Sequence, residues 1–390
     1  MTFVALDNKD WCKGIYHRGQ LHFDKLPEDL NRTWKYSSYL SDRDVLYASL
    51  YTQGKSIDDV CPEHLQEEWQ HYKKRLKAYH NSFVEAKVDL EQNCFFDLVP
   101  DQFLLELCET KVKIIDSVFH TTEKPANYQL LLGAEKIIHE ISQQDLNVDL
   151  DVLKNNLHDT RARTLMRRVK GKNKITYNLF GSKTGRLSIM PGTFPILNLD
   201  KEYKSIIKPQ NDLFIELDFN AAEVRTLLSL SGQEQPNGDI HEWNAKRLGI
   251  TREEAKTEIF AWLYGSKRVD GTKYEKLFKL DKVMDQYYDG FKIKNYFNRL
   301  INSDQFHSLN YLVQSTTSDL VLERLVKINN LILKRKSFIS FLVHDSVVID
   351  LAKEDKELVN LMVDIFSDTR LGRFPVNISA GKNYGELRKI

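Results

Sequence analysis

The chain has 390 residues and a mass of 45.6 kDa, which is enough for a large core and for two or three domains. Its 56 Lys and Arg residues nearly balance its 55 Asp and Glu residues, so the net charge does not by itself indicate a nucleic-acid partner. The four cysteines form no CxxC pair and no apolar run approaches the ~18 residues of a membrane span, which predicts a reduced, cytoplasmic protein without a zinc site or disulfide framework.

Residues 1 to 60 alternate short apolar stretches with turn residues, which predicts a small lobe that contains strands. The stretches are residues 3–6, 15–16 and 21–23. From residue 62 to 169 the chain is rich in helix formers, and residues 130–141 repeat apolar side chains at three- and four-residue spacing. We therefore expect a helical region after the lobe.

The segment 161–186 is the strongest electrostatic feature of the chain, because it contains nine basic residues and no acidic one. Such a block is typical either of a solvated loop or of a surface that contacts a phosphate backbone. Tyr177 and Phe180 interleave aromatic surface with the cations, which favours the second interpretation and a nucleic-acid partner.

Two apolar segments further along predict buried strands. Residues 213–219 (LFIELDF) predict one strand, with a helix expected over residues 221–229. Residues 338–351 predict two strands in a hairpin whose polar tip is His344-Asp345-Ser346. Residues 240–299, between these segments, predict a largely helical insert.

Asp218 and Asp345 each stand where an apolar strand ends, the first before a helix and the second at the hairpin tip. Either residue alone has an ordinary explanation, since aspartate caps helices and forms turns. An acid flanked by buried strand also needs a partner. At this point the sequence leaves both interpretations open.

The predicted helix 252–265 carries Arg252, Lys256, Phe260 and Tyr264 at four-residue steps, so these residues share one face. Two cations followed by two aromatic rings suit a nucleoside triphosphate, which offers charged phosphates and a flat base. The alternative is a surface helix that packs its two aromatic rings into the core.

These segments resemble the ordered motifs of the A-family DNA polymerases. DFNAAEVR (residues 218–225) resembles their first catalytic motif, RxxxKxxxFxxxYG (252–265) their nucleotide-binding finger helix, and VHDS (343–346) their second metal-binding motif. Further matches are TGRLS (184–188), a degraded PILN (195–198), DIH (239–241), NYLVQSTTSDL (310–320) and GKNYGE (381–386). Their order and spacing agree with the family over about residues 183–390.

The resemblance implies that Asp218 and Asp345 are catalytic residues that hold two Mg²⁺ ions, with the backbone carbonyl of Phe219 as a further ligand. One ion would activate the primer 3′-hydroxyl, and the other would neutralise charge on the phosphates and the leaving pyrophosphate. Magnesium, primer–template DNA and deoxynucleoside triphosphates are therefore the expected cofactor and partners.

The finger helix is expected, by the same resemblance, to hold the incoming nucleotide. Lys256 would stabilise the triphosphate and protonate the departing pyrophosphate, while Arg252 and His241 would bind phosphate oxygens. Phe260 would stack under the nucleotide, and a phenylalanine at this position predicts discrimination against dideoxynucleotides.

Glu223 matches the steric gate of the family, which fills the space of a ribose 2′-hydroxyl, and Tyr264 is expected to hold that carboxylate in place. Related single-subunit RNA polymerases have a small residue at the gate, so Glu223 argues against ribonucleotide synthesis. An RNA polymerase-like enzyme and a catalytically inactive DNA-binding subunit are the alternatives to a DNA polymerase.

Contacts with primer–template DNA are expected from a third set of residues, again by resemblance. They are Thr184, Arg186, Asn198, Asn310, Gln314 and His344. Asn310 and Gln314 match a helix that reads the minor groove near the primer end.

The sequence departs from the family at several positions. Ser346 stands where a glutamate is usual, Ala261 where a glycine is usual, and Ile259 where an asparagine is common. Fingers and thumb are short, as in the compact enzymes of phages. The nearest candidate for an exonuclease DxE pair, Asp7-Asn8-Lys9, lacks the glutamate. We therefore expect proofreading to be absent or supplied by another polypeptide.

The expected fold is an α+β right hand with an antiparallel-sheet palm, helical fingers and a helical thumb. The expected domains are an N-terminal lobe (1–60), a helical region that includes the thumb (61–182), the palm in two parts (183–232 and 303–390) and the fingers (233–302). The expected function is template-directed DNA synthesis in replication, with a phage as the expected source and a separate exonuclease or processivity subunit as an expected partner.

Overall fold

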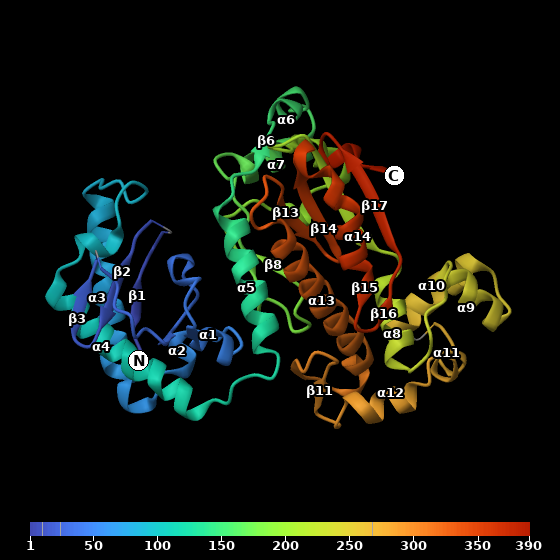
Figure 1. The fold of residues 1–390 in the computed structure, drawn as a ribbon, viewed down its shortest axis with the longest axis horizontal. Helices are drawn as coiled ribbons and strands as arrows, with labels where there is room; N and C mark the ends of the chain where they lie inside the picture. The colour runs from blue at the N-terminus through green and yellow to red at the C-terminus, as the bar shows by residue number, and fades with distance from the viewer. Residues whose placement is uncertain (10, 24, 267) are drawn as a thin grey trace. The chain divides into compact units, whose positions relative to one another are not determined.

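The computed structural model describes residues 1–9, 11–23, 25–266 and 268–390, and these form two compact units (Figure 1). The first unit is Met1–Leu132 and the second is Gly133–Ile390. The boundary falls inside the helical region expected over residues 61–182, so that region contributes to both units. No helix in the described residues is both long and apolar enough to cross a membrane.

The first unit is built on short strands and two long helices. Helix α4 (Asp101–Thr121) buries Phe103, Leu107, Ile114 and Val118 at helical spacing, contacts strands β1 and β3, and packs against α3 (Glu63–Glu85). The antiparallel strands β1 (Val4–Leu6), β2 (Gly14–His17) and β3 (Gln20–His22) lie where the sequence predicts strands. The other elements are the parallel pair β4 (Arg32–Thr33) and β5 (Leu46–Tyr47), helices α1 (Ala48–Tyr51) and α2 (Ile57–Val60), and 3-10 turns η1 (Ser38–Leu40) and η2 (Phe95–Leu98).

A disulfide joins Cys12 to Cys94, at a sequence separation of 82, so the prediction of no disulfide framework is wrong for this pair, while Cys61 and Cys108 are free. Sequence spacing did not reveal the pair because the fold brings two distant segments together. The backbone N–H of Phe95 donates to Asn8 Oδ1 at 3.2 Å, and Lys9 Nζ donates to the Asn93 carbonyl at 3.1 Å. The compartment in which the protein works stays a prediction.

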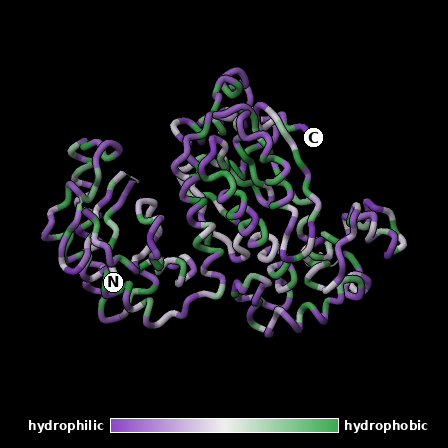
Figure 2. Tube along the Cα trace, viewed as in Figure 1, coloured by the Kyte–Doolittle hydropathy of each residue, from purple (hydrophilic) through white to green (hydrophobic). Residues whose placement is uncertain are grey.

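The second unit is centred on a five-stranded antiparallel sheet in the order β13-β14-β10-β17-β18. The strands are β10 (Leu213–Phe219), β13 (Phe338–Val343), β14 (Ser346–Leu351), β17 (Val376–Gly381) and β18 (Arg388–Lys389). The predicted strand β10 is central and buries Leu217 and Phe219 on one face, while Glu216 and Asp218 are half-buried on the other. Phe219 stacks on Phe366 of helix α14 (Val359–Ser367) with ring centroids 4.1 Å apart, and apolar residues concentrate in this region (Figure 2).

The predicted hairpin at residues 338–351 is confirmed, since β13 and β14 pair with Val343 opposite Ser346. His344, in the turn, adopts the left-handed region with a φ of 53°. Helix α13 (Gln305–Ile332) contacts β13, α14 and the helix α8 (Ala222–Leu230) that follows β10.

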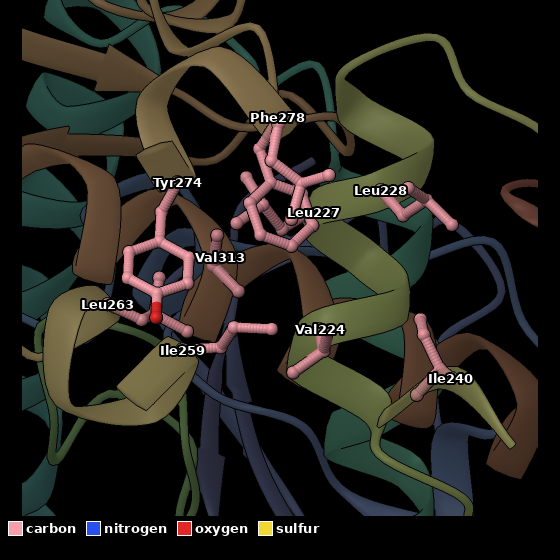
Figure 3. Packing of buried hydrophobic residues seen from close by; sticks show 10 residues of the cluster. Val224, Leu227, Leu228, Ile240, Ile259, Leu263, Tyr274, Phe278 and Val313 are labelled. Carbon is pink, nitrogen blue, oxygen red and sulfur yellow. The ribbon is translucent and has the colours of Figure 1, made fainter. Parts of the chain in front are cut away.

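The insert between the strand regions is largely helical, as predicted. It contains α9 (Ile240–Leu248), α10 (Arg252–Leu263), α11 (Thr272–Leu277) and α12 (Leu280–Tyr287), and ends in the hairpin of β11 (Lys292–Lys294) and β12 (Leu300–Asn302). Val224 and Leu227 of α8 share an apolar core with Ile259 and Leu263 of α10 and with Phe278 (Figure 3). This core fixes α10 against the helix that follows Asp218.

Helix α5 (Tyr128–Gln143) begins in the first unit and ends in the second. Helices α6 (Asp151–Asn155) and α7 (Thr160–Val169), which precede the sheet, have 5 and 10 residues, and the assignment of a thumb stays a prediction. Short pairs complete the unit: β6 (Asn147–Val148) with β9 (Ile207–Lys208), β7 (Tyr177–Asn178) with β8 (Ser188–Ile189), and β15 (Asp368–Thr369) with β16 (Gly372–Arg373). The 3-10 turns are η3 (Ile196–Asn198), η4 (Lys201–Ile206), η5 (Lys353–Leu358) and η6 (Tyr384–Glu386).

Candidate active site

Strand pairing brings the two predicted catalytic aspartates to the same edge of the sheet. Asp218, near the end of β10, lies directly opposite Ser346, the first residue of β14, and Asp345 immediately precedes Ser346. Opposite residues in an antiparallel pair have Cα atoms about 4.5–5.5 Å apart. The charge of Asp345 contributes to raising the pKa of Asp218, so the two carboxylates are within electrostatic reach of each other.

Both carboxyl groups have pKa values above their ordinary range. Burial raises the pKa of Asp218 to about 6, and the charges of Glu216 and Asp345 add to this shift. Asn377 Nδ2 lies 3.4 Å from Asp218 Oδ2, and its hydrogen bond opposes this rise in the pKa of Asp218. Burial likewise raises the pKa of Asp345, although the guanidinium of Arg186 opposes that shift. A bound cation would stabilise carboxylates that are crowded in this way.

The donor set at this edge fits a hard divalent cation, because carboxylate oxygens are ligands that Mg²⁺ prefers. Across the described part of the chain, no group of three or more His, Cys, Asp or Glu side chains is arranged to hold a metal ion. An ion at Asp218 and Asp345 would therefore complete its coordination with backbone, water or substrate oxygens, as Mg²⁺ commonly does. The ligand role of the Phe219 carbonyl stays a prediction.

Glu223, in the first turn of α8, is held by two side chains from other elements. It is 5 % exposed, and Tyr264 Oη donates to its two carboxylate oxygens at 3.0 and 2.9 Å. Arg186 Nη2 donates to Glu223 Oε1 as well. Burial raises the pKa of Glu223, and the Arg186 charge only partly offsets this. The expected contact between Tyr264 and Glu223 is present, while its role in sugar selection stays a prediction.

Helix α10 exposes three residues of its predicted face, while the fourth, Phe260, is half-buried and packs against the core that α10 shares with α8. A capping box between Thr251 and Glu254 starts the helix. Arg252 and Lys256 are exposed, and Tyr264, at the C-cap, is 50 % exposed. The alternative, in which both aromatic residues serve the core, therefore fails for Tyr264.

The predicted phosphate-binding residues gather near the start of α10. Arg252 forms an ion pair of 2.7 Å with Asp239, and Asp239 is the N-cap of α9. His241 is 6 % exposed, and its ring centroid lies 6.1 Å from that of Phe260. Burial lowers the pKa of His241, and the charges of Arg252 and Lys256 contribute to the shift. The side chains predicted to bind the nucleotide therefore lie close together and close to Asp239. They are His241, Arg252, Lys256 and Phe260.

The predicted DNA-contacting residues are placed less uniformly. Gln314 of α13 lies within hydrogen-bonding reach of Tyr264, and the side-chain amide nitrogen of Asn310, one turn earlier, is buried without a partner in the described structure. Thr184 is buried and His344 is exposed at the hairpin tip. Asn198 is instead exposed at the end of η3, where it lines a cavity with residues of α7.

Sequence reasoning missed the residues that fix the Arg186 turn. Gly185 has a φ of +74°, and a Cβ at this position would lie 2.5 Å from the Cζ atom of Arg299. The Arg299 guanidinium therefore packs directly on the glycine. Arg299 is itself buried and binds the fully buried Asp319 of α13, with Nη2 2.6 Å from Oδ1 and Nε 3.0 Å from Oδ2. The turn that presents Arg186 thus rests on a buried ion pair.

The basic segment retains unpaired cations on its surface. Arg161 pairs with Glu202 at 3.3 Å, and Arg163 donates to the carbonyls of Leu157 and His158. Five side chains form no ion pair with any described residue: Arg167, Arg168, Lys170, Lys172 and Lys174. This surface suits a polyanion, and its contact with DNA stays a prediction.

In the first unit, Asp7 directly follows strand β1 and accepts a hydrogen bond of 2.5 Å from Ser37 Oγ. Lys9, which stands where an exonuclease would need a glutamate, donates instead to the carbonyls of Leu90 and Asn93. The expectation of no proofreading site stays a prediction.

The fold is a mixed arrangement of helices and sheet that resembles a polymerase domain. One solved structure similar to this chain is the POL domain of Pol1 from M. smegmatis in complex with DNA primer-template and dNTP, with a TM-score of 0.64. The similarity covers 91 % of this chain and 86 % of that one at 11 % sequence identity, so it concerns the fold. No protein-family model and no curated protein sequence matches the chain.

Proposed function

We propose that the chain is a DNA-directed DNA polymerase of the A-family type, which adds deoxynucleotides to a primer 3′-hydroxyl and releases pyrophosphate. The observation that carries the proposal is the meeting of Asp218 and Asp345 at one sheet edge, in electrostatic contact with the network of Glu223, Tyr264 and Arg186. The fold likeness to a domain that binds primer-template and dNTP supports it. A replicative role in a phage is proposed only from the resemblance of the short fingers and thumb to those of compact phage enzymes.

In the proposed reaction, Asp218 and Asp345 hold two Mg²⁺ ions, which when bound activate the 3′-hydroxyl and neutralise charge on the phosphates. Lys256 is exposed and has no ion-pair partner among the described residues, so its ammonium is free to bind the triphosphate and to give a proton to pyrophosphate. Arg252 already pairs with Asp239, and phosphate binding would have to compete with that carboxylate.

Primer extension tests the proposal. The purified chain is incubated with a primed template and deoxy- or ribonucleotides, with and without MgCl₂. We expect magnesium-dependent extension with deoxynucleotides only. Equal use of ribonucleotides would favour the RNA polymerase-like alternative. Duplex binding without extension in magnesium or manganese would favour the inactive DNA-binding alternative.

Glu223→Ala is expected to lower the discrimination against ribonucleotides by roughly two orders of magnitude, because the carboxylate no longer fills the 2′ position. Tyr264→Phe removes only the hydroxyl that orients Glu223, so we expect a smaller loss of about tenfold, the value of one hydrogen bond to a charged group. The measurement is the ratio of kcat/KM for a deoxy- and a ribonucleotide. An unchanged ratio in Glu223→Ala would exclude Glu223 as the gate.

Arg186→Ala is expected to weaken primer–template binding and to reduce the slope of log K against log salt by about one, because a phosphate-facing cation acts through counterion release. Arg373→Ala is the matched control, since Arg373 is an exposed cation that pairs with Asp364 of α14 at 2.5 Å. Fluorescence anisotropy over a salt series measures both slopes. A slope that Arg186→Ala leaves unchanged would remove Arg186 from this role.

A further inference from the structure

Ser346 occupies the position where the resembled motif usually has a glutamate, but a carboxylate still lies beside it. Ser346 is 7 % exposed, and its Oγ lies 3.1 Å from Oε1 of Glu216 on the neighbouring strand β10. Glu216 and Ser346 are 130 residues apart in the sequence. The fold therefore brings a carboxylate to the serine from a different strand.

Glu216 also shares a face of the sheet with Asp218. Residues two apart on a strand point to the same side, and Ser346 lies opposite Asp218 in the register of β10 and β14. Glu216, Asp218 and Ser346 thus form one group at the sheet edge.

A purely structural role does not account for a carboxylate at this position. Glu216 is half-buried, and no Lys or Arg side chain of the described residues lies within ion-pairing distance of it. A neutral glutamine would also accept a hydrogen bond from Ser346, without adding charge next to Asp218. A carboxylate without an ion-pair partner, on the same face of the sheet as a second carboxylate, becomes favourable when a cation binds there.

We propose that Glu216 is a positioning residue for the divalent cations, and that it supplies from β10 the carboxylate that Ser346 does not carry. The proposal rests on the proposed function, since it takes the edge at Asp218 and Asp345 as the cation site. Glu216 acts by its charge and through Ser346, not as a third direct ligand, because no three acidic groups of the described residues are arranged to chelate an ion. In other metalloproteins, side chains that contact the metal ligands orient those ligands and raise metal affinity in this way.

Mn²⁺ binding to the free chain, measured by electron paramagnetic resonance, tests the proposal without reference to catalysis. Glu216→Gln should weaken Mn²⁺ binding by about tenfold, which is the size of loss seen when residues that support metal ligands are substituted. Adding Ser346→Glu to Glu216→Gln should restore most of the affinity, because it returns a carboxylate to the same edge. Glu357→Gln, an exposed glutamate in η5 beyond the opposite end of β14, is the charge-matched control and should change nothing.

The same variants in primer extension should require about tenfold more MgCl₂ for half-maximal rate in Glu216→Gln, with the rate at saturating MgCl₂ little changed. Unchanged Mn²⁺ affinity in Glu216→Gln, no recovery in a double variant that is folded by circular dichroism, or no Mn²⁺ binding by the unaltered chain would overturn the proposal. Failure of the unaltered chain to extend primers, with Mn²⁺ binding behaving as expected, would overturn the polymerase assignment and leave Glu216 at a cation site.

Discussion

Asp345→Ala should abolish primer extension, with the rate of single-turnover nucleotide addition falling by about 10³-fold or more. The substitution removes one of the two carboxylates that strand pairing brings together at the end of β10. Primer–template affinity should stay within about twofold, because binding to the DNA backbone depends on cations that neutralise phosphates, and Asp345 is not a cation. Rapid-quench measurement of a single addition and anisotropy of a labelled duplex determine the two quantities separately.

Asp364→Ala, on the exposed surface of α14, is the control for losing an acid and should leave the rate unchanged. Thermal unfolding in EDTA supplies an independent check. Because burial raises the pKa of Asp345 in the folded chain, its ionised form disfavours folding at neutral pH, so Asp345→Ala should not lower the melting temperature. Weakened duplex binding, or extension at the normal rate, would contradict the assignment of Asp345.

Local patterns were sufficient to predict the elements that carry the site. The apolar run 213–219 is bounded by turn residues and forms the central strand β10, and the apolar halves of 338–351 form the β13–β14 hairpin around a polar tip. Helix α10 was predictable from four-residue spacing, and Thr251 and Glu254 add a capping box at its start. In each case the signal lies within about 15 residues of sequence.

Contacts between distant segments were not predictable in this way. In the alternation of apolar and polar residues along β10, Glu216 looks like an ordinary solvent-facing residue. No sequence signal near it indicates that Ser346 contacts it. Asp319 lies in α13, where Ser315, Thr316 and Thr317 are also buried, so small polar side chains hide the burial of the helix from a hydrophobic pattern. Charged side chains are rarely fully buried unless paired, so nothing in the local sequence indicated that Arg299 and Asp319 are buried.

Asp319→Ala should reduce the free energy of unfolding by about 3–5 kcal/mol, because it leaves the Arg299 guanidinium buried without its counter-charge. Asn295 Nδ2, which donates to Asp319 Oδ2 at 2.8 Å, loses a partner as well. Urea unfolding followed by circular dichroism measures the change. Asp304→Ala, an exposed cap of α13, is the matched control and should cost only about 1 kcal/mol. A loss for Asp319→Ala no larger than that of the control would show that the pair is not a buried support.

Replacing both partners separates stability from the positioning of Arg186. Arg299→Met with Asp319→Leu removes both buried charges, and such exchanges are often neutral, so most of the lost stability should return, to within about 1–2 kcal/mol. The guanidinium that packs on Gly185 would still be missing, so Arg186 should be held less firmly against Glu223. We therefore expect a stable variant whose discrimination against ribonucleotides is reduced. If the double variant recovers both stability and discrimination, the ion pair only stabilises the fold, and the turn at Gly185 keeps Arg186 in place without it.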